Sequence, residues 1–178
     1  MNFRTQRFEL RSLIGKNLEP AYFEWLQDPE INRYLNIYGT KLSKESIRRY
    51  VDSHMEPDDH FFGIYDLDNK MIGTHSFRYS PLTRRCAVGG MIGDKSYWGK
   101  GVILETRATL LSYAFDDRDC FKVEAVCYKE NLAAIYNFLR QGWTKEGVFR
   151  AHRTINGTSE DLIMFGLLKE EWDGRRQV

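Results

Sequence analysis

The sequence predicts a mixed α/β domain in which a mostly antiparallel central sheet is flanked by helices. Several short segments alternate apolar and polar residues, as half-buried strands do, and other segments repeat apolar residues at helical spacing. Turn-forming Gly, Asn and Asp residues separate these segments. With 178 residues the chain is long enough for one hydrophobic core, so we expect residues 1–178 to form a single domain.

The first half of the chain is expected to alternate strands with two helices. Phe8 and Leu10 alternate with charged residues, which indicates a first strand. Pro20 favours a helix start, and Ser43 is a favourable N-cap for a second helix. Turn-forming residues at 66–69 indicate a hairpin. The expected elements are strands at 8–12, 61–65, 71–77 and 84–93, and helices at 20–26 and from residue 44 onward.

The second half is expected to contain two helices and three strands. Each helix carries apolar residues that fall on one face, and we expect both faces to be buried. Asn156 and Gly157 favour a tight turn between the last two strands. The helical stripes are Leu104, Ala108, Leu111 and Phe115, and then Leu132, Ile135, Tyr136 and Leu139. The expected strands are 121–128, 144–152 and 159–168.

Composition excludes several classes of protein. The 26 basic and 25 acidic residues give a net charge of +1, so we expect no nucleic-acid partner. The three cysteines, Cys86, Cys120 and Cys127, lack the spacing of a zinc site and are odd in number, so we expect neither a metal nor a disulfide framework. Charges near the N-terminus argue against a leader, and no apolar stretch is long enough for a membrane span. A cytoplasmic protein is expected.

A glycine-rich loop at residues 98–101 is the most informative motif. It follows the strand at 84–93 and precedes a helix that opens at Val102. The first N–H groups of a helix lack partners and bind anions, and glycine lets a phosphate approach the backbone. The loop has neither the Lys-Ser/Thr pair of a P-loop nor the spacing of a dinucleotide site. A tight turn without a ligand is the alternative.

The segments around this loop give the chain a resemblance to the GNAT superfamily of acetyl-coenzyme A-dependent N-acetyltransferases. A strand, the glycine loop and a helix are followed by a second strand, by Asn131 and Ala134 at a helix start, and by Gly142 and Trp143 at its end. The segment from Glu146 to Leu168 resembles the closing hairpin of the Rim-type branch, which includes ribosomal-protein, polyamine and amino-sugar acetyltransferases. The resemblance implies the GNAT fold and acetyl-coenzyme A as acetyl donor.

The resemblance also implies which residues bind the coenzyme. The backbone of the loop would bind the pyrophosphate, Asn131 would meet the pantetheine arm or act as a plain N-cap, and the strand before the loop would pair with the pantetheine amides. Lys100 could add a charge contact or lie in solvent. The residues implied are Met91, Ile92, Gly93, Trp98, Gly99, Lys100, Gly101, Val102, Ile103 and Asn131.

In this family, two positions often carry the catalytic acid and base. In this chain they correspond to Ala87 and Phe138, neither of which can transfer a proton. The remaining candidates for proton transfer are His75, Glu124, Tyr128, Tyr136, His152 and Asp161, of which we favour His75, Glu124 and Tyr136. A histidine on an apolar strand face is more often structural than catalytic. Tyr136 lies in an apolar helical stripe, which favours core packing, and water alone is a further route for the protons.

The acceptor is expected between the first two helices and the last hairpin, where this family binds amines. Arg150, His152 and Arg153 suit a phosphate-bearing acceptor, so a nucleotide-linked amino sugar is the favoured substrate. The other side of this site would consist of Trp25, Asn32, Arg33, Tyr34 and Tyr38.

Three alternatives stay open. The acceptor could be a protein N-terminus or a polyamine, and the chain could be a non-catalytic acyl-coenzyme A sensor. The sequence does not identify the acceptor, and the oligomeric state stays open, with a homodimer among the options.

Overall fold

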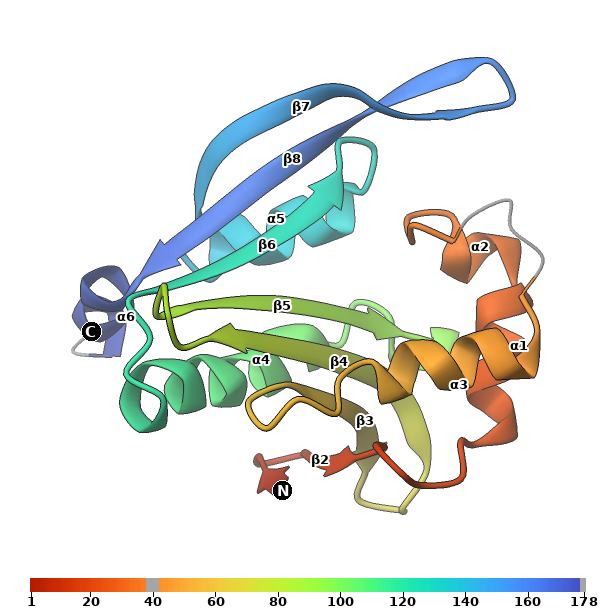
Figure 1. Cartoon of the computed structure of the whole chain (residues 1–178), viewed down its shortest axis with the longest axis horizontal. Helices are drawn as coiled ribbons and strands as arrows, with labels where there is room; N and C mark the ends of the chain where they lie inside the picture. Colours follow the sequence, from red (N-terminus) through yellow and green to blue (C-terminus); the bar gives the residue numbers. More distant parts are fainter. Residues whose placement is uncertain (38–41, 177–178) are drawn as a thin grey trace. The chain divides into compact units, whose positions relative to one another are not determined.

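The computed structural model describes residues 1–37 and 42–176 (Figure 1), so Tyr38 lies outside the described residues. The chain divides into two compact units, which we describe separately: Met1–Tyr79 with Val88–Leu110, and Ser80–Ala87 with Leu111–Val178. Within the described residues, no helix is long and apolar enough to cross a membrane.

The first unit contains the N-terminal strands and helices and the glycine loop. Its elements are β1 (Asn2–Arg4), β2 (Phe8–Ser12), α1 (Pro20–Gln27), α2 (Pro29–Asn32), α3 (Lys44–Asp52), β3 (His60–Asp66), β4 (Met71–Ser80), the end of β5 (Arg85–Ile92), the 3₁₀ turn η1 (Lys95–Tyr97) and most of α4 (Val102–Ser112).

The second unit contains the remaining elements. These are the start of β5, the π-helical turn η2 (Tyr113–Asp117), β6 (Lys122–Tyr128), α5 (Leu132–Arg140), β7 (Thr144–Ile155), β8 (Thr158–Leu168) and α6 (Lys169–Arg176).

The strands of the described chain are hydrogen-bonded in the order β1-β2-β3-β4-β5-β6-β8-β7. The pairs β1/β2, β2/β3, β3/β4, β6/β8 and β7/β8 are antiparallel, and β5/β6 is parallel. The mixed, mostly antiparallel sheet with flanking helices confirms the fold class that the sequence predicted.

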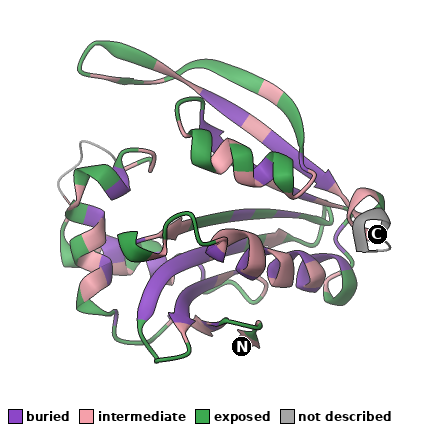
Figure 2. Ribbon diagram, turned by 180° about the vertical axis from the view of Figure 1, so that it is seen from behind, coloured by how far each residue is buried: buried purple, intermediate pink, exposed green. Residues whose placement is uncertain are grey.

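Residues on both faces of β3 and β4 are buried, because helices pack against both faces. Leu26 of α1 and Val51 of α3 join Phe61 of β3 in one buried apolar cluster. On β4, His75 instead contacts Thr106 of α4. Figure 2 shows these central strands as largely buried.

Local signals in the sequence specified several elements correctly. Ser43 and Ser46 form a reciprocal capping box at the start of α3. Asn156 and Gly157 both have positive φ and join β7 to β8 as a two-residue turn. The sequence analysis missed β1, α2 and α6, which are short or highly charged.

The prediction of one buried stripe on α5 was wrong. Leu132, Tyr136 and Leu139 are 73%, 60% and 55% exposed, whereas Phe138 is 5% exposed. Apolar residues occur on nearly every side of this short helix, so periodicity could not select the inner face. The Phe138 ring decides it by stacking on Phe165 at 4.8 Å between ring centroids.

The expected buried face of α4 was correct only in part. Leu111 and Phe115 are buried, but Leu104 and Ala108 are half-buried. Val102, Thr106 and Leu110 are buried instead. The chain changes to the π-helical turn η2 at Tyr113, so Phe115 lies in that turn and not in α4.

Candidate active site

The glycine loop has the backbone geometry of an anion site. Gly99 and Gly101 have φ of 72° and 73°, which is the region that favours glycine. No atom lies within 4 Å of a Cβ built on Gly99, so the loop is open on that side. Within the described chain, the N–H groups of Gly99, Gly101, Val102 and Ile103 have no hydrogen-bond acceptor. These groups at the start of α4 fit the pyrophosphate of a coenzyme.

The side chains beside these N–H groups each contact another part of the protein, although Trp98 and Lys100 are also exposed. The Trp98 indole N–H donates to the Ile92 carbonyl at 2.9 Å. The Ile103 side chain lies toward Gly90 of β5. The Lys100 ammonium lies 5.2 Å from the centre of the Tyr97 ring, in a cation–π contact.

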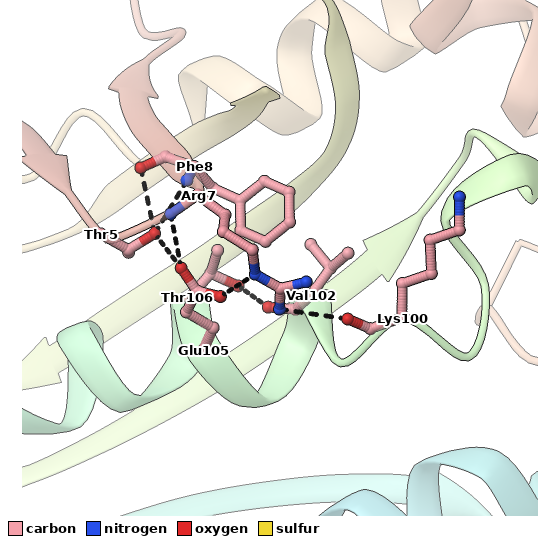
Figure 3. A network of polar contacts seen from close by, with 7 residues as sticks. All are labelled: Thr5, Arg7, Phe8, Lys100, Val102, Glu105 and Thr106. Carbon is pink, nitrogen blue, oxygen red and sulfur yellow. Dashed lines mark hydrogen bonds and ion pairs between the residues drawn. The ribbon is translucent and has the colours of Figure 1, made fainter. Parts of the chain in front are cut away.

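A set of contacts from the β1–β2 turn supports this loop (Figure 3). The Arg7 guanidinium donates to the Glu105 carboxylate at 2.7 Å and to the Lys100 carbonyl at 3.1 Å. Thr5 donates to the other Glu105 oxygen at 2.6 Å. Burial acts to raise the pKa of Glu105, but the hydrogen bonds from Thr5 and Arg7 outweigh it and hold the pKa below its usual value.

The end of β5 precedes the loop. Gly93 donates its N–H to the Ile72 carbonyl at 3.0 Å. Its Cα faces Trp25 of α1 so closely that a Cβ there would lie 1.9 Å from the indole. Met91 packs against the apolar cluster of α1, α3 and β3. The pairing of Met91, Ile92 and Gly93 with pantetheine stays a prediction.

His75 is buried, and both of its ring nitrogens have partners. Nδ1 lies 3.0 Å from the Gly89 carbonyl oxygen, which can only accept, so the neutral ring carries its proton there. Nε2 lies 2.8 Å from the Thr106 hydroxyl. Burial lowers the pKa of His75 to about 4. These contacts support the structural role that the sequence left open.

The other two favoured proton-transfer candidates lie in the second unit. The Glu124 carboxylate accepts from Arg85 at 3.1 Å and lies 3.3 Å from the Lys122 ammonium. Tyr136 is exposed on α5, which excludes the core packing expected for it. Asn131 accepts the Ala134 N–H at 3.1 Å, so its role as an N-cap is confirmed, while contact with pantetheine stays a prediction.

A pocket of about 610 Å³ lies in the first unit beside Trp25 and Gly93. Its wall contains four carboxylates and two ammonium groups: Glu19, Glu24, Asp28, Asp94, Lys70 and Lys95.

Two of the four carboxylates are already paired. Asp28 lies 2.8 Å from Lys95, and Asp94 lies 2.6 Å from Lys70. Both lysines hold the pKa of their partner carboxyl below its usual value. Neither Glu19 nor Glu24 has an ion-pair partner within the described residues, so the wall carries an excess of negative charge.

The expected acceptor residues have varied environments. In the first unit, Asn32 is buried and donates to the Leu26 carbonyl, and Arg33 lies over the Tyr34 ring. In the second unit, Arg153 donates to Glu160 at 2.8 Å and stacks on Tyr128 at 3.7 Å.

The two other residues of the expected phosphate-binding hairpin are less constrained. Arg150 is exposed, and His152 contacts the Phe149 ring. Because Arg153 is already paired, Arg150 and His152 are what the hairpin retains for a phosphate.

Sequence reasoning missed Arg7, Glu105 and the acidic pocket. Arg7 and Glu105 are 98 residues apart, and no local pattern connects them. Asp28 and Asp94 carried a signal, because each precedes a helical turn as an N-cap, but that signal describes the turn and not the pocket.

Comparison with known proteins defines the class. Residues 7–144 match the family model of the acetyltransferase (GNAT) domain, so the chain belongs to the GNAT acetyltransferases. It is an acetyl-coenzyme A-dependent N-acetyltransferase rather than the non-catalytic sensor that the sequence left open.

Three proteins illustrate the similarity. The chain is 28% identical over 175 residues to the N-acetyltransferase p20 of Bacillus licheniformis, itself uncharacterised, covering 96% of this chain and 97% of p20. A GCN5-related N-acetyltransferase from Brucella melitensis superposes with a TM-score of 0.81 at 20% identity, covering 99% of this chain and 82% of the other. A spermidine N-acetyltransferase from Vibrio cholerae, solved with CoA and spermine, gives 0.77 at 19% identity, with coverage of 93% and 97%.

Proposed function

We propose that this enzyme transfers acetyl from acetyl-coenzyme A to a small cationic amine that carries a second positive charge, such as an alkyl diamine or polyamine. The observation that supports this proposal is the acidic pocket beside Gly93. Its two unpaired carboxylates, Glu19 and Glu24, attract an ammonium group. Trp25, Ile31 and Met71 line the same pocket and offer apolar surface to the methylene groups of such a molecule.

The acceptor needs a charged group for binding and an uncharged amine for the reaction. The attacking amine must be neutral, because its lone pair forms the new N–C bond while the C–S bond of the thioester breaks. A molecule with two amines satisfies both needs: one ammonium binds Glu19 and Glu24, and the other amine reacts after losing its proton to water.

The leaving thiolate needs a proton, and Tyr136 is our candidate donor. Of the three favoured candidates, Tyr136 is the one whose residue is largely exposed, whereas His75 is buried and Glu124 is paired with Arg85 and Lys122. An acid must reach the group that it protonates, which favours an exposed residue.

A nucleotide-linked amino sugar is the second candidate acceptor. The exposed Arg150 and His152 on the β7–β8 hairpin favour it, since both can bind phosphate. Arg153 contributes less, because Glu160 already balances its charge.

Steady-state kinetics with both acceptor classes separates these proposals. We expect the double variant Glu19→Gln/Glu24→Gln to lower kcat/KM for a diamine by about 10-fold, since each exposed ion pair contributes up to roughly 1 kcal/mol. In this double variant, kcat/KM for a neutral monoamine and KM for acetyl-coenzyme A should not change. Glu56→Gln, an exposed glutamate outside the pocket, is the matched control. Faster turnover of the nucleotide-linked sugar, lost in Arg150→Ala, would contradict the diamine proposal.

A further inference from the structure

The β1–β2 turn places one guanidinium against both the glycine loop and the first helical turn after it. Arg7 Nη2 donates to the Lys100 carbonyl at 3.1 Å, and Arg7 Nε donates to Glu105 at 2.7 Å. The Arg7 backbone N–H also donates to Glu105 at 2.8 Å. Figure 3 shows Arg7 between these two partners. The loop and α4 are thus tied to one residue that is far away in sequence.

The contact with Lys100 fixes the direction of a coenzyme-binding N–H group. The Lys100 carbonyl and the Gly101 N–H belong to the same planar trans peptide, so they point in opposite directions. By holding the carbonyl on one side, Arg7 directs the Gly101 N–H to the other. That N–H is among those without an acceptor in the described residues.

Packing does not fix this peptide. A Cβ built on Gly99 would meet no atom within 4 Å, and one built on Gly101 would meet only the Arg7 guanidinium, at 3.8 Å. Glycine has more backbone freedom than any other residue, so two glycines around Lys100 allow the peptide to rotate. Arg7 donates a hydrogen bond to the carbonyl of this peptide and so restrains that rotation.

Arg7 also compensates a charge that opposes coenzyme binding. Glu105 lies in the first turn of α4, the end of the helix that favours anions. Its carboxylate remains ionised, because its pKa is lowered, and an uncompensated carboxylate there would repel phosphate. The Arg7–Glu105 ion pair balances that charge locally.

We propose that Arg7 is a positioning residue for the coenzyme, which holds the glycine loop in the conformation that binds pyrophosphate. The β1–β2 turn is therefore part of the coenzyme site. This inference goes beyond the proposed acceptor, since it concerns the donor side and holds for any amine.

Calorimetric titration of the amine-free protein with coenzyme A and with pantetheine tests the inference. Pantetheine lacks the pyrophosphate, so only the binding of coenzyme A should depend on the glycine loop. We expect Arg7→Ala to weaken coenzyme A binding by about 10-fold, the effect of losing roughly one charge-assisted hydrogen bond, and to leave pantetheine binding within about 2-fold. Arg4→Ala removes a positive charge from the same hairpin and is the matched control.

Hydrogen exchange provides a readout that needs no ligand. In the coenzyme-free protein, Arg7→Ala should speed exchange of the Lys100 and Glu105 amides, whose N–H groups donate to the Tyr97 and Gly101 carbonyls, relative to the Arg4→Ala control. Arg7→Lys keeps the charge near Glu105 but cannot hold two partners in a planar fork, so an intermediate loss of coenzyme A affinity is expected. This variant also serves as the test if Arg7→Ala does not fold.

Three results would overturn the proposal. One is an equal loss of affinity for coenzyme A and pantetheine, which would indicate a general structural defect. Another is unchanged coenzyme A affinity in both Arg7 variants. The third is full recovery in Arg7→Ala/Glu105→Gln, because that double variant restores the charge balance without restoring the contact to Lys100. Continued weak binding by the double variant would support positioning.

Discussion

Removing the buried His75 ring should change how the stability of this protein depends on pH. The pKa of His75 is 6.5 in an unfolded chain and about 4 in the folded one, because burial penalises the charged ring. Between these values the unfolded state binds a proton that the folded state does not, so stability falls as the pH falls from 6.5 toward 4. The stabilisation is fully present above pH 6.5. Linkage gives a loss of about 2 kcal/mol between pH 8 and pH 5.

Urea unfolding of the wild type and His75→Gln at pH 8, 6.5 and 5 measures this effect. Glutamine can still hydrogen-bond to Gly89 or Thr106 but does not titrate. We expect the variant to be less stable at pH 8 and the difference in unfolding free energy to shrink by about 2 kcal/mol at pH 5. His152→Gln, which removes an exposed histidine, is the control. A stability difference between wild type and His75→Gln that stays constant across the three pH values would refute the reasoning.

Two further predictions concern α5. Tyr136→Phe should lower kcat by about 10²- to 10⁴-fold if the hydroxyl protonates the leaving thiolate, with KM for acetyl-coenzyme A unchanged, and an unchanged kcat would leave water as the donor. Phe138→Ala should lower the free energy of unfolding by about 3–5 kcal/mol because it empties the space beside Phe165, whereas Leu132→Ala should change it by less than about 0.5 kcal/mol. Chemical denaturation of both variants tests this contrast, and similar losses would show that the burial of α5 is misassigned.

The sequence was most informative where a backbone conformation needs a particular residue. Gly99 and Gly101 mark the loop because positive φ suits glycine, and Asn156-Gly157 marks the hairpin turn for the same reason. Ser43 marks a helix start because its side chain replaces a missing backbone partner. In each case the signal lies within a few consecutive residues. The glycine loop could therefore be located from the sequence.

Features that depend on distant segments were not predictable in this way. The inner face of α5 depends on Phe165, which belongs to another element, and periodicity alone chose the wrong side. The acidic pocket combines residues of α1 with residues that follow β3 and β5. Glu19 and Asp94 are each ordinary surface residues in the sequence, and their common location results from the fold.

The contact between Arg7 and Glu105 has a consequence for folding. It closes a loop of 98 residues, and chain entropy makes such a closure cost about 4 kcal/mol. Long-range contacts of this kind form late compared with helices and hairpins. During synthesis, the turn that contains Arg7 emerges long before Glu105 exists, so the glycine loop reaches its supported form only after most of the first unit has been made. A truncation that removes residues 1–7 would leave the loop sequence intact and still deprive it of this support.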